Sequence, residues 1–500
     1  MSSRSLAATQ RARAIAQHMM ASTQASITPS NGSAGPGEAP VLFETRGSIR
    51  KYILNRPQKL NALDTTMLNI LRPYVEEWSR SNQNSILVGT GVGRAFCAGG
   101  DVAGVVQDAS DPATRPEAIS FFQREFELDF LLAALPRPYV AIMDGYTMGG
   151  GVGLSAHAPF RIATENTAFA MPETKIGYCP DVGASYFLSR VDGEIGTYLG
   201  LTGDVIRGRE VFELGFATHF IPSRRIPSLL ERLASLDDPT YKMIDRTIEE
   251  CSEARNADDP APSLAGPQRV AIDTAFAHNQ VEKILESLKG MTESHENSAI
   301  RTWAQVTLDA LELRSPTSLK VALAAIRKGK TINLQEALQM ELNIATAYCS
   351  GASPDFHTGV TAVLVDKIIE RPAWYPATLG EVSDSEISKK FFSDYTPTSG
   401  TSPALAFPEA LDPAKGTRFS PVSFALPTEQ EIRQLVDGSH ASSGATAITL
   451  QELLNKLNLL RQGKMGIREK VLEVVERCCV QDEEKETGEK YLRWKSSAAH

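Results

Sequence analysis

Apolar residues in the first part of the chain form short β-type runs, separated by polar turns and by one amphipathic segment. Runs over residues 41–44, 48–54 and 85–89 predict strands. Between the last two, residues 64–80 have helical spacing. Asp64 is suited to be the N-cap of this helix because its side chain can accept a hydrogen bond from a free backbone amide. The alternation of strands and helices predicts an α/β fold.

A glycine-rich turn follows the next apolar run. Residues 139–143 predict a buried strand, and the chain then passes through Gly145 and the cluster Gly149–Gly151. We expect this cluster to open a short helix of small residues from Gly153. Free backbone N–H groups at the start of a helix attract negative charge, so the turn is a candidate site for a developing anion.

Two carboxylates follow the apolar run at residues 160–163. Glu173 and Asp181 are eight residues apart, and each stands next to a proline. Amides that stabilise an anion, close in sequence to a pair of acids, suit chemistry on a carbonyl group whose oxygen becomes negative. The alternative is that both acids are ordinary turn or cap residues.

A second glycine pair, Gly99 and Gly100, lies between a predicted strand and a helical stretch. Glycine at such a position lets a ligand approach the backbone closely, although a tight turn would also explain the pair. Together with the cluster at Gly149–Gly151, it allows two amides from separate segments to converge on one oxygen atom.

Other motifs are weaker. Residues 151–156 match the GxGxxA dinucleotide-binding pattern, but this pattern is short and glycine is common. Gly329-Lys330-Thr331 lacks the upstream glycine of a P-loop. Ser155 and His157 are near neighbours on one predicted helix and cannot face each other as nucleophile and base.

Composition excludes several classes of protein. The net charge of −9 argues against nucleic acid as the main ligand, so we expect no DNA binding. The six cysteines have no CxxC spacing and the histidines are scattered singly, which predicts reduced thiols and no structural metal site. No apolar run reaches the ~18 residues that a membrane span needs.

The N-terminal 37 residues contain arginine and serine but no aspartate or glutamate. This composition is typical of an organelle transit peptide, here for mitochondrial import; a disordered tail is the alternative. The C-terminal part predicts two further helices, because Thr428-x-x-Glu431 and Thr449-x-x-Glu452 match capping boxes and a helical apolar stripe runs on to residue 478. These helices either fold back on the core or form a docking module for another protein.

Several motifs, in this order along the chain, resemble the crotonase (enoyl-CoA hydratase/isomerase) superfamily. They are AFCAGGDV, GYTMGGGVGLS and MPETKIGYCPDVGASYFL, within a resemblance that spans about residues 41–379. The closest likeness is to the mitochondrial 3-hydroxyisobutyryl-CoA hydrolases. The resemblance implies a spiral of ββα repeats with a helical C-terminal region, to which this chain adds a C-terminal helical extension.

The resemblance also implies roles for individual residues. The thioester oxygen would lie between the backbone amides of Gly100 and Gly150, and Glu125 would contact the substrate. Glu173 and Asp181 match the acids of the hydrolase subgroup that act on the thioester. The turn containing Lys59, Leu60 and Ala62 would line the adenine side of the coenzyme A site.

The same resemblance separates hydrolases from hydratases. Enoyl-CoA hydratases carry a second catalytic glutamate where this chain has Gly153, and a glycine where it has Asp181. The implied reaction is therefore hydrolysis of a short 3-hydroxyacyl-CoA, such as 3-hydroxyisobutyryl-CoA in valine catabolism, in the mitochondrial matrix. It needs no metal and no cofactor beyond the coenzyme A of the substrate. The oligomeric state is left open, a homo-oligomer included.

A different class of function is also implied. Some fungal mitochondrial ribosomes contain a small-subunit protein similar to this hydrolase, so the ribosomal small subunit is an alternative partner, with or without turnover. The expected domains are a transit peptide and linker (1–40), a crotonase core (41–250), a helical region completing the acyl-CoA pocket (251–380), a disordered linker (381–427) and a helical extension (428–500).

Overall fold

The computed structural model describes residues 39–81, 85–256, 259, 262–393, 403–407, 422–444, 447–483 and 488–495. The proposed transit peptide therefore lies outside the described residues, as do parts of the proposed linker. Among the helices that are described, none is both long and apolar enough to cross a bilayer.

Two sheets form the centre of the molecule. The larger sheet has the order β1-β2-β3-β5-β7-β10, and the smaller has the order β4-β6-β8-β9. The strands of the larger sheet are β1 (Val41–Arg46), β2 (Ile49–Leu54), β3 (Ile86–Gly91), β5 (Tyr139–Met143), β7 (Phe160–Ala163) and β10 (His219–Phe220). Those of the smaller are β4 (Ala95–Cys97), β6 (Tyr146–Met148), β8 (Ala168–Ala170) and β9 (Ile206–Arg207).

Successive strands of the core form pairs that each place one strand in each sheet, and this produces the ββα repeat. Each pair, β3–β4, β5–β6 and β7–β8, gives its first strand to the larger sheet and its second to the smaller, before the chain enters helical structure. Neighbours β2 to β10 pair in parallel in the larger sheet, as do β4, β6 and β8 in the smaller. This arrangement confirms the predicted spiral of ββα units.

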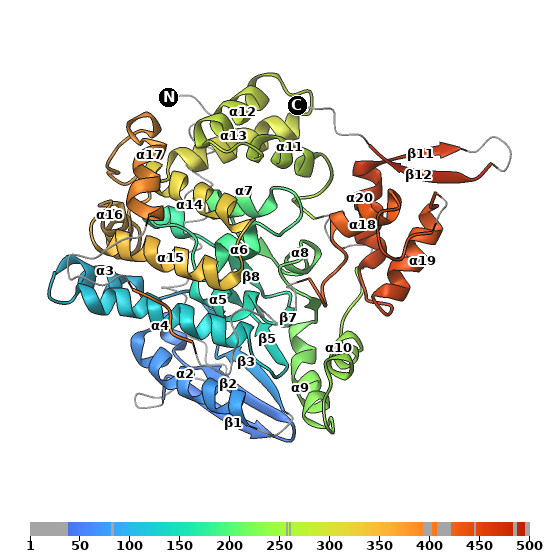
Figure 1. Cartoon of the computed structure of the whole chain (residues 1–500), viewed down its shortest axis with the longest axis horizontal. Coiled ribbons are helices and arrows are strands. Elements are labelled where there is room, and N and C mark those ends of the chain that lie inside the picture. The colour runs from blue at the N-terminus through green and yellow to red at the C-terminus, as the bar shows by residue number, and fades with distance from the viewer. Residues whose placement is uncertain are drawn as a thin grey trace.

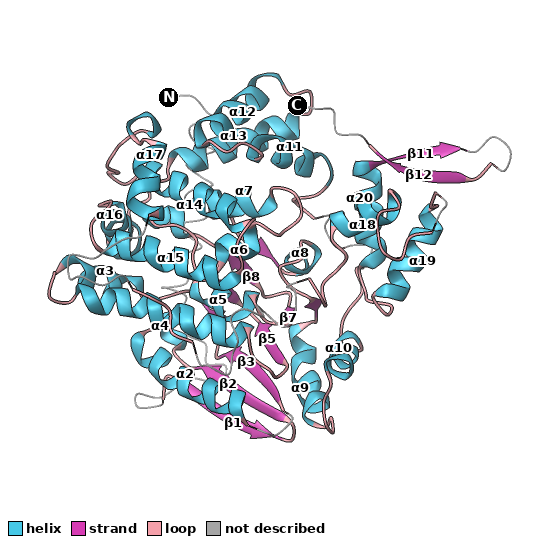
Figure 2. Cartoon of the chain, in the orientation of Figure 1, coloured by secondary structure: helices cyan, strands magenta, loops and turns pink. Residues whose placement is uncertain are grey.

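Helices cover both sheets (Figures 1 and 2). In the core they are α2 (Thr65–Arg80), α3 (Val102–Ser110), α4 (Arg115–Ala133), α5 (Gly150–Ala156), α6 (Ala184–Leu188), α7 (Ile195–Thr202), α8 (Arg209–Glu213), α9 (Ile226–Ala234) and α10 (Tyr241–Glu249). The helical region contains α11 (Gly266–Phe276), α12 (Val281–Ser294), α13 (Ser298–Glu312), α14 (Pro316–Gly329), α15 (Leu334–Cys349) and α16 (Asp355–Gly359). Asp64 caps α2 as predicted, since its side chain accepts a hydrogen bond from the Met67 amide at 2.8 Å.

The C-terminal extension differs from its prediction. It contains three helices rather than two, α18 (Glu429–Val436), α19 (Leu450–Leu460) and α20 (Ile467–Cys478), followed by a hairpin of β11 (Cys479–Glu483) and β12 (Lys490–Trp494). The apolar stripe is interrupted because Gly463 and Gly466 have φ of 79° and 86°, outside the helical region. Figure 1 shows the extension beside α8, α10 and α11, with the hairpin projecting from the molecule.

The prediction of a disordered linker over 381–427 is wrong for its described parts. Residues 384–392 are helical: α17 (Asp384–Ile387) continues into a wider helical turn, Ser388–Phe392, in which Phe391 is buried. Residues 403–407 then cross α4 and α15, and the ring of Phe407 lies 4.2 Å from that of Phe130. Polar and charged neighbours concealed Phe391, and the composition of residues 392–427, rich in proline and serine, concealed Phe407.

Candidate active site

The site forms where three parallel strands of the smaller sheet end. β4 is followed by Gly99 and Gly100, β6 by Gly149 and Gly150, and β8 by Met171, Pro172 and Glu173. Because β4, β6 and β8 are neighbours and parallel, their carboxyl ends share one edge. Ligands of open parallel sheets bind at this edge.

The glycines converge there. Gly99 and Gly149 have φ of 113° and 47°, which side chains other than glycine rarely adopt. A β-carbon placed on Gly149 would lie 3.5 Å from the α-carbon of Gly99 and 3.0 Å from Oε1 of Glu173. The predicted meeting of two glycine segments is thus present, with the Glu173 carboxyl beside it. Neither the Gly100 nor the Gly150 N–H donates to another backbone group within the described chain.

The helix that carries Gly150 begins earlier than predicted. Its first residue is Gly150 rather than Gly153, so the Gly150 amide belongs to the unpaired first turn of α5. The amide is therefore free to donate to a ligand oxygen.

The turn with Lys59, Leu60 and Ala62 is anchored to this edge. Backbone amides of Ala98 and Asp101 donate to the carbonyl oxygens of Leu60 and Leu63, at 3.0 and 2.8 Å. Lys59 is exposed, while Leu60 and Ala62 are half-buried. The turn thus borders the Gly99–Gly100 segment, in a position that suits contact with a ligand extending from the site.

Glu125 projects onto the start of α5 from α4. A β-carbon on Gly150 would overlap Oε1 of Glu125, so a larger residue there would have to displace the Glu125 carboxyl. This oxygen is buried and has no hydrogen-bond partner within the described residues. Burial raises the pKa of Glu125 to about 8.

Glu173 and Asp181 are also buried. Burial, together with the charge of Glu125, raises the pKa of Glu173 to about 8. Burial and then the charge of Glu173 raise the pKa of Asp181 well above its ordinary value. The structure therefore brings the two predicted acids and Glu125 into one electrostatic group, in which full ionisation is disfavoured.

Two further acids belong to this group and were not predicted. Asp129 lies one turn after Glu125 on α4, and both of its oxygens are buried without a partner among the described residues. A β-carbon on Gly153 would lie 2.5 Å from Oδ2 of Asp129, so the Asp129 carboxyl occupies the space beside that glycine. Glu341, on α15, is 1% exposed and binds the loop that follows Asp181. Acids within apolar stretches, two in FELDFLL and one in LQMELNIA, are the sequence signal that would have found both.

Ser155 and His157 do not form a nucleophile–base pair. The Ser155 hydroxyl donates to the carbonyl oxygen of Gly151 at 2.8 Å, and His157 Nε2 donates to the carbonyl oxygen of Val182 at 2.9 Å. Burial lowers the pKa of His157 to about 4, so the ring is neutral near pH 7. Both side chains are structural.

A search against protein families matches residues 49–392 to the family described as Enoyl-CoA hydratase/isomerase. The chain belongs to this family. The match covers the two sheets and the helical region and ends before residues 403–407 and the C-terminal extension.

The relatives matched by this chain include two kinds of protein. Small ribosomal subunit protein mS47 of Neurospora crassa is 37% identical over 97% of this chain and 94% of its own length. The mitochondrial 3-hydroxyisobutyryl-CoA hydrolases of Danio rerio and Homo sapiens are 40% and 39% identical, each over 71% of this chain and 89% and 88% of their own lengths. Similarity to the ribosomal protein thus extends over nearly the whole chain, while the hydrolases match a shorter part.

Solved structures agree with the fold. A carnitinyl-CoA dehydratase from Mycobacterium thermoresistibile superposes with a TM-score of 0.64 at 31% identity, over 74% of this chain and all of that one. An enoyl-CoA hydratase from Rhodobacter sphaeroides gives 0.60 at 30% identity, over 71% and 97%. The crotonase fold predicted from the motifs is therefore confirmed.

Proposed function

We propose that this chain hydrolyses the thioester of a short 3-hydroxyacyl-CoA, with 3-hydroxyisobutyryl-CoA as its substrate, in the valine catabolism of the mitochondrial matrix. The observation that carries this proposal is the Glu173 carboxyl beside two glycine segments, in which the Gly100 and Gly150 amides donate to no backbone group of the described residues. Relatives named 3-hydroxyisobutyryl-CoA hydrolase support the choice of substrate.

The amides of Gly100 and Gly150 would bind the thioester oxygen. Negative charge grows on this oxygen when the carbonyl carbon is attacked, and amide donors that are already in place stabilise it. Removing one such donor typically lowers the rate by about 10²–10³-fold.

Glu173 would drive the attack in one of two ways. As a general base it takes a proton from water while the water oxygen bonds to the carbonyl carbon, and the proton then passes to the departing sulfur of coenzyme A. As a nucleophile it forms an anhydride and releases coenzyme A, and water then hydrolyses the anhydride. Both routes consume one water and yield a free acid and a thiol, using only carboxyls and backbone amides of the chain.

Asp181 and Glu125 would act on the acyl part. Burial raises the pKa values of both carboxyls, that of Glu125 to about 8, which favours the protonated form that can donate a hydrogen bond to the substrate hydroxyl. Burial raises the pKa of Glu173 to about 8, near the working pH, where a general base is most effective.

Thiol release from a panel of short acyl-CoAs tests this function. The full-length protein should cleave 3-hydroxyisobutyryl-CoA with a higher kcat/KM than isobutyryl-CoA, which lacks the hydroxyl. Comparison with 3-hydroxypropionyl-CoA then defines the acyl group. Failure to release thiol from every member of the panel would refute the proposal.

A second candidate function is that of a structural component of the mitochondrial ribosomal small subunit, with or without hydrolase activity. The observation in its favour is the match to Small ribosomal subunit protein mS47, which covers 97% of this chain and so includes most of the C-terminal extension. Sedimentation of the tagged protein in a mitochondrial lysate tests this role: migration with small subunits supports it, and migration as a free protein refutes it.

A further inference from the structure

The loop after Asp181 has an unfavourable backbone conformation. Val182 has φ of 56°, which is rare for a β-branched residue because its side chain crowds the backbone. Such a conformation is strained and persists only where its surroundings hold it. Since Asp181 immediately precedes Val182, the contacts that hold this loop also fix the direction of the Asp181 side chain.

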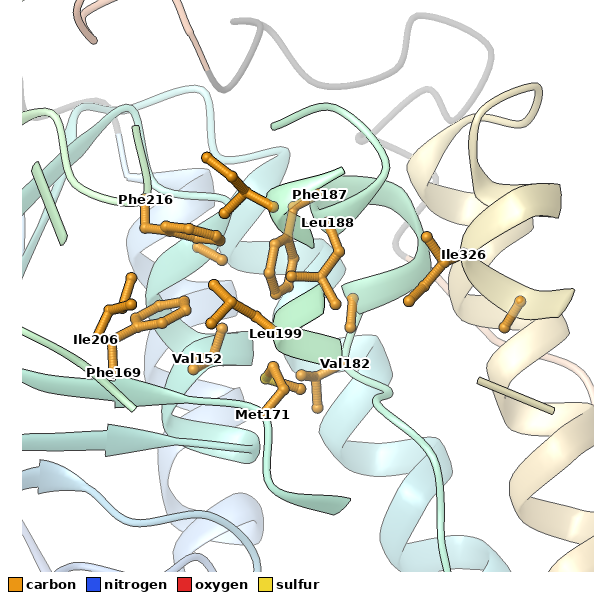
Figure 3. Close-up of a cluster of buried hydrophobic side chains, with 14 of the residues drawn as sticks. Val152, Phe169, Met171, Val182, Phe187, Leu188, Leu199, Ile206, Phe216 and Ile326 are labelled. Carbon is orange, nitrogen blue, oxygen red and sulfur yellow. The ribbon is translucent and has the colours of Figure 1, made fainter. Parts of the chain in front are cut away.

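Two of these contacts lie on the core side of the loop. The Val182 side chain is 1% exposed and lies in a hydrophobic cluster with Met171 and Leu199 (Figure 3). The Val182 carbonyl oxygen accepts a hydrogen bond from His157 at 2.9 Å. The loop is therefore tied to α5 and to the residues that follow β8.

The third contact comes from the helical region. Glu341, on α15, accepts hydrogen bonds from the Gly183 amide at 2.6 Å, the Ser185 amide at 2.9 Å and the Ser185 hydroxyl at 2.5 Å. One carboxylate oxygen serves Gly183 and the other serves Ser185. Three donors on two oxygens suit a carboxyl group, because an amide side chain has one acceptor oxygen and would turn its NH₂ towards a donor. Burial raises the pKa of this carboxyl to about 7, and the three hydrogen bonds oppose that rise.

The Glu341 carboxyl also faces the other acids of the site. The charge of Glu341 raises the pKa values of Asp181 and Glu173, and also that of Asp129 on α4. The Tyr178 hydroxyl and the Cys179 thiol face it as well, and its charge raises their pKa values too. A change at Glu341 therefore reaches the catalytic acids through space as well as through the loop.

We propose that Glu341 is a positioning residue for the hydrolysis: its carboxylate fixes the Asp181 loop and sets the charge that Asp181 and Glu173 experience. This inference rests on the proposed hydrolase function. It assigns to α15, 160 residues beyond Asp181 in sequence, a direct part in shaping the site.

Glu341→Gln tests the inference, with Glu336→Gln as the matched control. Glu336 lies on the same helix, but its exposed side chain closes the capping box with Asn333. We expect Glu341→Gln to lower kcat by about 10- to 100-fold through misplacement of the loop, and Ser185→Ala to lower it less. The acid limb of the kcat/KM profile should move to lower pH in Glu341→Gln, because a negative neighbour of Glu173 is lost. Glu336→Gln should change neither kcat nor the pH profile of kcat/KM.

Hydrogen exchange separates this inference from the proposed function. In the wild type the Gly183 and Ser185 amides should be protected, and Glu341→Gln should speed exchange in residues 181–188 but not in α12 or α13. If wild type releases no thiol, the proposed function fails while this measurement still reports on the loop. Unchanged exchange in the loop, or a loss of thermal stability with wild-type kcat and pH profile, would overturn the role of Glu341.

Discussion

The carboxyl of Glu125 lies directly over the α-carbon of Gly150, so closely that a β-carbon there would overlap Oε1. We therefore expect Gly150→Ala to displace Glu125 and to shift the amide that would bind the thioester oxygen. The rate of thiol release should fall by at least about 10²-fold, the typical effect of losing one oxyanion donor. Gly104→Ala is the control, because a β-carbon at that glycine meets no atom within 4 Å. Similar rates for the two variants would contradict the assignment.

Asp129 makes the stability of the fold depend on pH. Its pKa is raised by burial and then by the charge of Glu125, so the native state keeps this proton at pH values where the unfolded chain has lost it. The contribution of Asp129 to stability is therefore most favourable at low pH and is lost as pH rises above the ordinary aspartate pKa. Asp129→Asn should be more stable than wild type at pH 8 by at least about 1 kcal/mol, with a smaller difference at pH 5. Urea unfolding at both pH values measures this; a difference independent of pH would contradict it.

The activity should rise with pH across the pKa of Glu173. With that pKa at about 8, Glu173 is mostly protonated at pH 6 and cannot act as base or nucleophile. We expect kcat/KM for 3-hydroxyisobutyryl-CoA to increase about tenfold per unit between pH 6 and 7, then to level off above pH 8. A profile that is flat from pH 6 to 9 would show that ionisation of Glu173 does not limit the reaction.

The C-terminal extension is fastened to the core by a buried cation. Lys464 Nζ lies 2.9 Å from Nε2 of His219 and 3.3 Å from Oε2 of Glu249. Replacing Lys464 with Met removes a charged hydrogen-bond donor from the Glu249 carboxylate, which should lower the free energy of unfolding by about 2 kcal/mol. We expect a lower melting temperature for Lys464→Met than for Lys456→Met, which changes a lysine on α19. Equal melting temperatures would mean that the extension does not depend on this contact.

The elements predicted correctly are those with long or regular hydrophobic signals. β5 is fully buried and is an apolar run in the sequence, β7 is fully buried and apolar except for Arg161, and the spacing and Asp64 cap of α2 are plain in the sequence. The strands that form the site, β4, β6 and β8, have three residues each and are too short for periodicity to reveal. The site at the edge of these strands was located from the glycine and acid motifs rather than from the hydrophobic pattern.

Tertiary contacts account for what the sequence did not show. Asp129 and Glu341 lie within helices, where a lone acid normally faces solvent, and only the packing of α4, α5 and α15 makes them buried. Phe391 and Phe407 were hidden in a segment whose composition favours disorder, and each is held by a partner distant in sequence. Local signals therefore found the catalytic candidates and missed the residues that hold them.

In the proposed reaction, Glu173 acts on a thioester held at Gly100 and Gly150. Thiol release from 3-hydroxyisobutyryl-CoA by wild type, Glu173→Gln and Glu127→Gln tests this role. Glu127 is also buried, but it pairs with Arg72 and accepts a hydrogen bond from the Ala406 amide, on another face of α4. We expect Glu173→Gln to lower kcat by about 10²–10⁴-fold, with little change in KM, and Glu127→Gln to retain activity. Hydrolysis by Glu173→Gln at the wild-type rate would contradict the claim.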